Sequence, residues 1–181
     1  ADLLVNATDA DGSSLTATGL KISAGSGELI DNGGGSWTYT PALDDDTSVS
    51  LAYTVTDGHL AVPGHATLDI TPVNDAPTLT AASLPLRAGQ SLVLGPTQLG
   101  ATDTDSSLAS LLFVVTDVHN GRFEWVAAPG AAIAEFTPAD VAAGRVRFVS
   151  TSGTEAPSFR LTVFDGGLHS AEVDAAIAFT P

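Results

Sequence analysis

One series of motifs occurs twice, in the same order, within this sequence of 181 residues. Residues 6–11 (NATDAD) return as residues 100–105 (GATDTD), and residues 53–58 (YTVTDG) return as residues 161–166 (LTVFDG). Self-similarity in a fixed order is the signature of a repeated structural unit. The sequence therefore predicts two copies of one fold rather than a single large domain.

The predicted boundary between the two copies is a short proline-containing stretch, residues 71–77 (TPVNDAP). Proline cannot donate to a strand ladder and holds the backbone extended, so this stretch is a stiff linker. The join is placed near Ala76, which gives repeats over 1–76 and 77–181. Repeat one reaches its first motif at residue 6, whereas repeat two runs 23 residues, from 77 to 99, before the matching point. Two alternatives stay open: the first strand of repeat one is missing, or it is supplied differently.

Short alternating runs of apolar and polar residues, rich in Val, Leu, Ile and Thr, predict strands rather than long helices. The predicted strands cover residues 15–23, 35–39, 49–56, 65–70, 91–94, 111–118, 122–127, 145–150, 158–164 and 171–179. The fold class is therefore all-β, with two tandem antiparallel β-sandwich domains of the cadherin or immunoglobulin type.

Three local features refine this prediction. Asn120-Gly121 between two apolar runs is typical of a type I′ hairpin. Residues 138–143 form one predicted helical turn, with Thr137 as its N-cap. Trp37 and Tyr39 alternate on one strand face, which favours packing in a core.

Composition excludes several classes of function. The chain has 21 acidic and 6 basic residues, a formal charge of −15, which is unsuited to binding nucleic acid or an anionic membrane. No run of about 18 apolar residues exists to enter a bilayer. There is no cysteine, the four histidines lack metal-ligand spacing, and no nucleophile motif occurs. We therefore expect no membrane insertion and no enzymatic activity.

Several motifs of repeat one together resemble the cadherin-like tandem repeats of large bacterial surface adhesins. These motifs are LLVNATDADG at 3–12, WTYTP at 37–41, YTVTDG at 53–58 and VNDAP at 73–77. Repeat two, with FTPADV at 136–141 and FDGG at 164–167, is similar to the chondroitin-sulfate-proteoglycan type of cadherin-like repeat. The resemblance implies a string of seven-stranded sandwiches with calcium at the joints, exported to the cell surface.

The acidic residues are also placed where a joint would need a cation. Loops of an antiparallel sandwich alternate between its two ends. Asp103 and Asp105, together with Asp165 in the last hairpin, are therefore expected at the top of repeat two. Residues 44–46 are expected at the bottom of repeat one, with Asn74 and Asp75 between the two groups. Carboxylates crowded in this way repel unless a cation neutralises them.

Calcium accepts six to eight oxygen ligands in flexible geometry, whereas magnesium needs a tighter octahedron. The alternative is that Asp and Asn only form turns. A half-site of Asp9, Asp11 and Asp57 is expected at the other end of repeat one. The predicted Ca²⁺ ligands are Asp9, Asp11, Asp44, Asp45, Asp46, Asn74, Asp75, Asp103 and Asp105.

The sequence thus predicts a calcium-stiffened extracellular spacer or adhesion module of a large repetitive cell-surface protein. Its expected partners are neighbouring repeats of the same chain. The alternative is a calcium-dependent, lectin-like module whose partner is an extracellular polysaccharide.

Overall fold

The computed structural model describes residues 2–181 and divides the chain into two compact units. Unit 1 ends at Val73, and unit 2 spans Asn74–Pro181, so Asn74 and Asp75 belong to unit 2. Strands dominate both units, and the described residues contain one short helix. The predicted all-β class with two tandem domains is confirmed. None of the helical structure in residues 2–181 has the length and apolar character needed to cross a bilayer.

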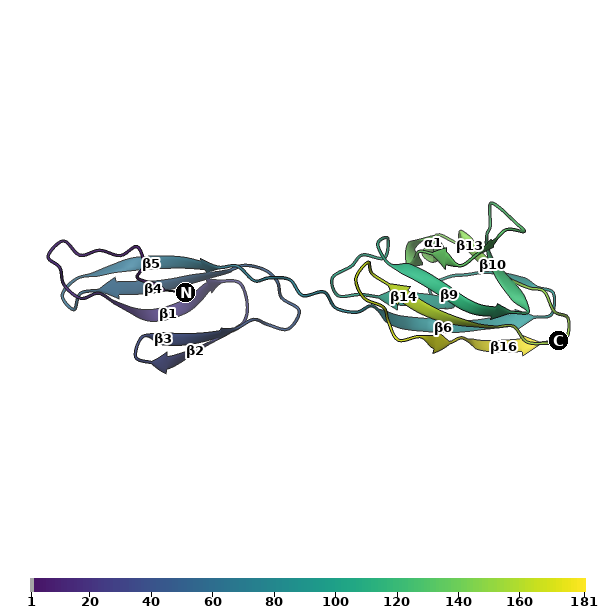
Figure 1. Cartoon of the computed structure of the whole chain (residues 1–181), viewed down its shortest axis with the longest axis horizontal. Helices are drawn as coiled ribbons and strands as arrows, with labels where there is room; N and C mark the ends of the chain where they lie inside the picture. The colour runs from purple at the N-terminus through teal and green to yellow at the C-terminus, as the bar shows by residue number, and fades with distance from the viewer. Residues whose placement is uncertain (1) are drawn as a thin grey trace. The chain divides into compact units, whose positions relative to one another are not determined.

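Unit 1 contains one three-stranded sheet and one separate hairpin (Figure 1). The antiparallel sheet has the order β1-β4-β5, with β1 at Thr16–Ala24, β4 at Val49–Thr56 and β5 at Ala61–Leu68. The hairpin pairs β2 (Glu28–Gly33) with β3 (Ser36–Thr40). Strand β2 falls outside the ranges predicted from the sequence.

The core of unit 1 is small. Its buried apolar side chains are Ala17, Val49, Leu51 and Val55, and of these Val49 is fully buried. Alternation along β4 explains three of these, because residues 49, 51 and 55 face the same side of the strand. Trp37 and Tyr39 of β3 alternate as expected, but each is only half-buried.

Unit 2 is built from three sheets. Their strand orders are β11-β10-β13-β7, β12-β9-β14-β15 and β16-β6-β8. The bounds are β6 Thr78–Arg87, β7 Ser91–Val93, β8 Leu99–Thr102, β9 Leu112–His119, β10 Gly121–Trp125, β11 Ala132–Ile133, β12 Glu135–Phe136, β13 Val146–Ser150, β14 Ser158–Phe164, β15 Val173–Asp174 and β16 Ala176–Thr180. Strand β16 runs parallel to β6, and the two lie side by side in Figure 1.

Five phenylalanines form the centre of the unit 2 core. The Phe123 ring stands edge-on to Phe148 and Phe159, with centroids 4.9 and 4.8 Å apart. Phe136 packs against both Phe123 and Phe113. Aromatic pairs in these geometries add to the stabilisation from buried area. Unit 2 therefore has a continuous core that positions its loops firmly.

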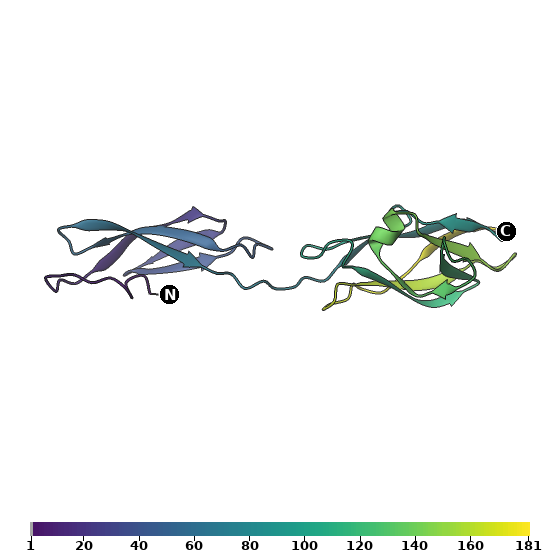
Figure 2. The same ribbon diagram turned by 90° about the horizontal axis from the view of Figure 1, so that it is seen from above.

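The predicted helical turn is confirmed as α1, Pro138–Ala142, which is visible on one side of unit 2 in Figure 2. Thr137 Oγ1 accepts a hydrogen bond from the Asp140 backbone N–H, and the Asp140 side chain accepts one from the Thr137 backbone N–H. This reciprocal capping box satisfies two donors at the helix start.

The hairpin predicted at Asn120-Gly121 is wrong. Strands β9 and β10 do not pair with each other but belong to different sheets, so the chain crosses from one layer to the other at this turn. Asn120 does adopt a positive φ of 55°, and its carbonyl accepts a hydrogen bond from Thr151. The Asn-Gly pair identified a turn correctly. However, β10 pairs with β13 and β9 pairs with β14, so tertiary structure and not the turn determined the strand partners.

Candidate functional site

Three chain segments meet where the chain enters unit 2. The first contains Asn74 and Asp75, the second is the loop after β8, and the third is the loop after β14. Asn74 Nδ2 donates a 2.8 Å hydrogen bond to Asp165 Oδ2, and the Asp75 backbone N–H donates a 2.7 Å bond to Asp105 Oδ2. The entering segment is therefore fastened to both loops through carboxylates.

The loop after β8 is organised by Asp103. Asp103 Oδ1 accepts hydrogen bonds from the backbone N–H groups of Asp105 (2.8 Å) and Ser106 (2.6 Å). Asp103 Oδ2 is different: among residues 2–181 it is the one buried side-chain oxygen or nitrogen with no hydrogen-bond partner. Leaving such an atom unsatisfied costs about 1–3 kcal/mol, and more when it is charged. This oxygen is the feature of the loop that turn formation does not explain.

Asp165 caps the loop after β14. Its Oδ1 accepts backbone hydrogen bonds from Gly167 (2.6 Å) and Leu168 (2.7 Å). The N–H groups of Leu168 and Gly167, followed by the Asn74 amide, lower the pKa of the Asp165 carboxyl below its usual value. Asp165 is therefore a carboxylate at neutral pH, and each of its oxygens accepts at least one hydrogen bond.

The oxygen donors at this end of unit 2 suit a hard cation in their chemistry. Carboxylates, an amide and backbone carbonyls are the ligands that calcium takes, and no His or Cys is present among them. However, no three His, Cys, Asp or Glu side chains within residues 2–181 are close enough to form a group that could hold a metal ion. The structure thus brings Asn74, Asp75, Asp103 and Asp105 together without arranging their carboxylates as a closed cage.

Two of the predicted ligands in unit 1, Asp9 and Asp45, cap turns of their own. Asp9 Oδ1 accepts hydrogen bonds from the backbone N–H groups of Asp11 (3.0 Å) and Ser13 (2.9 Å). Such Asx turns are an ordinary use of aspartate in loops. They account for Asp9 without a bound ion.

The loop containing residues 44–46 is held in the same way. Asp44 has a positive φ of 56°, and Asp46 is exposed. Asp45 accepts hydrogen bonds from Ser26 Oγ and, at 3.0 Å, from the Thr47 N–H. The Ser26 hydroxyl, then the Thr47 side chain and backbone, lower the pKa of Asp45. The bonds of Asp45 thus run to its own loop and to the turn before β2.

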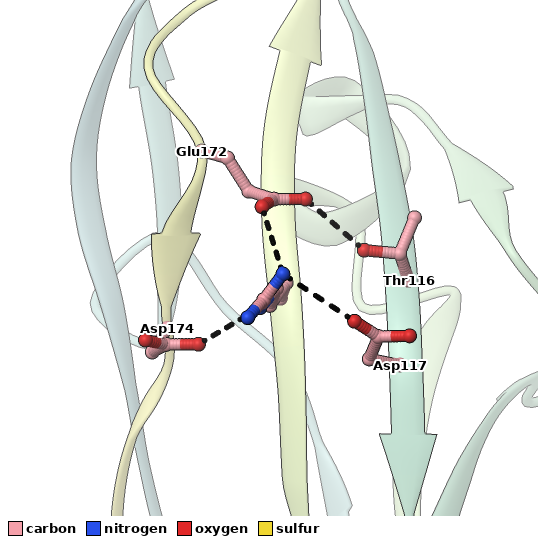
Figure 3. Close-up of polar contacts among 5 residues, drawn as sticks. Thr116, Asp117, Glu172 and Asp174 are labelled. Atoms are coloured by element: carbon pink, nitrogen blue, oxygen red, sulfur yellow. Dashed lines mark hydrogen bonds and ion pairs between the residues drawn. The ribbon is translucent and has the colours of Figure 1, made fainter.

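A second acidic group, which the sequence analysis missed, surrounds Arg160 on the sheet β12-β9-β14-β15 (Figure 3). The Arg160 guanidinium lies 3.5 Å from Asp117, 3.4 Å from Glu172 and 3.3 Å from Asp174. These carboxylates raise the pKa of Arg160, with Glu172 as the largest cause. Glu172 and Asp174 are two positions apart within the strand predicted at residues 171–179, and this alternation was the available signal. Since all four side chains are largely exposed, the group serves chiefly to join β15 to β14.

Both units match known sequence families. Residues 1–71 match the family described as "Cadherin-like domain", and residues 77–179 match the family described as "Cadherin-like". The matches confirm the resemblance to cadherin-like repeats for both halves of the chain. The bacterial adhesin context stays a prediction.

Individual relatives are far longer than this chain. It is 38% identical over 87 residues to the mouse "Extracellular matrix organizing protein FRAS1", covering 46% of the chain and 2% of that protein. It is 28% identical over 172 residues to rat "Chondroitin sulfate proteoglycan 4", covering 93% of the chain and 7% of that protein. The chain therefore spans 7% or less of the length of either relative.

A solved structure with a similar fold is the EC1-2 fragment of human protocadherin-24. It has a TM-score of 0.56 and 18% sequence identity, with 96% of this chain and 85% of that fragment covered. At this identity the likeness concerns the fold alone. The family match over residues 77–179, more than half of the chain, shows that the chain belongs to the cadherin-like family.

Proposed function

We propose that this chain is an extracellular spacer or adhesion module in which Ca²⁺ holds the entering segment against unit 2. The observation that carries the proposal is the unpartnered, buried Asp103 Oδ2, which lies in a loop already bonded to Asp75 through Asp105. The proposed ligands in unit 2 are Asn74, Asp75, Asp103 and Asp105. The role is structural, without a catalytic step.

The charge and burial of this loop explain why an ion would bind. A buried carboxylate oxygen without a donor is unfavourable in the ionised form, and a cation removes that penalty. The Asp105 carboxylate and the Asn74 amide supply further oxygen donors on segments that are hydrogen-bonded at this end of unit 2, and the proposed ion would draw them into one coordination shell. A bound ion would then stabilise the position of residues 74 and 75 on the two loops.

The setting of the proposal follows from the relatives. One of them is named as an extracellular matrix organising protein, and the chain is similar to short parts of such large proteins. We therefore place this module outside the cell, with neighbouring repeats of the same chain as its partners. A place on a bacterial cell surface and recognition of polysaccharide remain predictions from the sequence.

The proposal can be tested by thermal unfolding of the full chain in millimolar calcium and in chelator. Extracellular calcium modules bind with Kd values of roughly 10⁻⁴–10⁻³ M. Calcium at about ten times its Kd would raise the free energy of unfolding by about 1.4 kcal/mol. We expect a clear increase in the Tm of unit 2 with calcium.

The sharpest variant is Asp103→Asn, because the amide oxygen can still cap the turn while the buried charge is removed. We expect this variant to lose most of the calcium-dependent increase in Tm while its Tm in chelator stays at or above that of the wild type. Asp69→Ala, a change of an exposed aspartate in unit 1, is the control and should respond to calcium as the wild type does. Identical melting in calcium and chelator for the wild type would show that Asp103 is only a turn residue.

A further inference from the structure

Three of the chain's six basic residues lie on the outer face of one sheet of unit 2, the sheet β11-β10-β13-β7. Phe123 of β10 pairs with Phe148 of β13, and both are buried in the core, so the residues next to them along each strand point outward. The outward residues include three arginines and three valines, which together are called the arginine face: Arg122, Arg145, Arg147, Val93, Val126 and Val149. An acidic chain thus carries a locally basic surface.

The arginines of this face are only partly used by unit 2 itself. Arg122 and Arg147 both donate through Nε to the carboxylate of Glu124, which is 0% exposed. Arg145 donates through Nη1 to Asp140. A guanidinium has five N–H donors, so each of the three arginines keeps donors for a further carboxylate. The face holds three guanidiniums against two carboxylates and therefore stays positive.

The outer face of the sheet β12-β9-β14-β15 is acidic (Figure 3). Glu135 precedes the buried Phe136 on β12, so its side chain points outward. The same face carries Arg160 and the carboxylates around it. Its four carboxylates together are called the acidic face: Asp117, Glu135, Glu172 and Asp174. With one guanidinium among them, this face stays negative.

The two faces lie on opposite sides of one core. Phe123 of the first sheet packs against Phe136 and Phe159 of the second, with ring centroids 5.4 and 4.8 Å apart. Because the two sheets meet through these inner faces, their outer faces point in opposite directions. One copy therefore cannot join its own two faces, whereas two copies can place the arginine face of one against the acidic face of the other.

The charges on the two faces have the same spacing along the chain. Arg145 and Arg147 are two positions apart at β13, and Glu172 and Asp174 are two positions apart at β15. Two residues of extended chain span roughly 7 Å, so guanidiniums and carboxylates at this spacing can meet pair by pair. Arginine and carboxylate can also form bidentate hydrogen bonds, which adds geometric specificity to the attraction.

We propose that unit 2 binds unit 2 of a second copy of this chain, with the arginine face of one against the acidic face of the other. The observation that favours a second copy is that one unit presents both members of a complementary pair of faces. The contact is heterologous, so each copy keeps one face free and the contact can repeat from copy to copy. The proposal does not depend on the cation site.

The charge of the whole chain, −15, opposes this association, and salt separates the two effects. At an ionic strength of about 0.01 M the Debye length is about 30 Å, so the repulsion between whole chains dominates. At about 0.15 M it is about 8 Å, which screens remote charges but leaves the pairs in contact. At about 1 M it is about 3 Å, and exposed pairs are weakened as well. Association should therefore be greatest at the intermediate ionic strength.

Sedimentation equilibrium of the full chain tests this directly. Chelator is present throughout, so that no divalent cation bridges carboxylates of two copies. At about 0.15 M ionic strength we expect the average mass to rise with concentration above the 18.2 kDa of one chain. At about 0.01 M and at about 1 M ionic strength we expect the mass to stay near that of one chain.

Two variants each disable one face. Arg145→Glu reverses a charge on the arginine face, and Asp174→Lys reverses one on the acidic face; the two side chains are 68% and 86% exposed, so the core is untouched. Each variant alone should associate at least tenfold more weakly than the wild type. Mixed in equal amounts, the first still offers its acidic face and the second its arginine face. The mixture should therefore form a complex of one copy of each and grow no further.

Matched controls separate the faces from the total charge. Arg87→Glu changes the net charge as Arg145→Glu does, and Asp69→Lys changes it as Asp174→Lys does, but both controls lie outside the two faces. Each control should associate as the wild type does. If a face variant and its control weaken association equally, net charge alone is responsible and the proposal is wrong.

Three further outcomes would overturn the proposal. The first is a wild type that stays monomeric at millimolar concentration at all three ionic strengths. The second is association that strengthens steadily with salt, which would assign the contact to exposed apolar side chains such as Val93. The third is saturable binding of a hexaglutamate peptide to a wild type that remains monomeric. That result would assign the arginine face to an acidic segment of another protein.

Discussion

Gly121 packs directly on the ring of Phe148: a Cβ at this position would overlap ring atom Cζ and would lie 2.6 Å from Cε1. Gly121 is the first residue of β10, and Phe148 lies opposite Phe123 on β13. The glycine is therefore required by the core of unit 2 and not by the conformation of the turn before it.

Gly121→Ala should consequently destabilise unit 2. Forcing an extra methyl group into a packed core usually costs about 1–3 kcal/mol. Urea unfolding of unit 2, followed by Trp125 emission in a Trp37→Phe background, would measure the loss. Gly153→Ala is the matched control, because a Cβ at Gly153 has no atom within 4 Å and should leave the midpoint nearly unchanged. Equal midpoints for the two variants would contradict the packing argument.

A second prediction concerns pH and the buried carboxylate of Glu124 on β10. Glu124 accepts hydrogen bonds from the Gly130 backbone N–H (2.8 Å), Arg122 (2.8 Å) and Arg147 (2.7 Å). The Gly130 N–H and then the Arg122 guanidinium lower the pKa of Glu124 from 4.5 to about 2. A carboxyl with a lowered folded-state pKa stabilises the fold above the unfolded value. Its contribution should be complete above pH 4.5 and should disappear as the pH falls towards 2.

Glu124→Gln should therefore be less stable than the wild type at pH 7, and the difference should narrow between pH 4.5 and 2. Urea unfolding at several pH values, read from Trp125, would test this. Glu135→Gln, a change of an exposed glutamate on β12, serves as the control for general loss of charge. A stability difference that is constant over this pH range would show that the ionisation of Glu124 does not contribute.

A third prediction concerns the exposed group around Arg160. Replacing Arg160 with Gln leaves Asp117, Glu172 and Asp174 near one another without a cation, so their repulsion should lower the Tm of unit 2 at low ionic strength. The loss should largely disappear in about 1 M salt, where the Debye length is about 3 Å. Thermal unfolding at low ionic strength and in about 1 M salt would measure the loss of Tm. Arg87→Gln is the control. A loss that does not respond to salt would indicate packing rather than charge.

The sequence predicted the repeated architecture because alternation and turn residues are local signals. The helix cap at Thr137 was predicted for the same reason. Strand β6 was not predicted, since Pro85 interrupts its pattern and proline inside a run argues against a strand. In the structure, β6 pairs with β8 only as far as Ala82, so at Pro85 the strand has one paired neighbour, β16. The backbone N–H that Pro85 lacks is therefore tolerated, and only the tertiary arrangement of the strands shows this.

The candidate site, like the fold, was predicted from the sequence only in part. The meeting of Asn74 and Asp75 with the loop of Asp103 and Asp105 follows from the alternation of loops between the two ends of a sandwich. The sequence could not indicate that Asp103 Oδ1 caps a turn while Oδ2 is left buried without a donor, because that depends on side-chain orientation. The turns capped by Asp9 and Asp45 show why an aspartate in a loop does not by itself identify a metal ligand.

The parallel pairing of β6 with β16 has a mechanical consequence. The chain enters unit 2 at the start of β6 and leaves it at the end of β16, so tension along the polypeptide slides these strands past each other lengthwise. Five residue pairs, from Ser83 with Ala176 to Arg87 with Thr180, are then loaded together in shear. The evenly spaced bonds of a parallel pair share such a load, whereas a hairpin pulled at its open end would lose them one after another. Unit 2 is built so that the strands that bear the load are also the ones that close the domain.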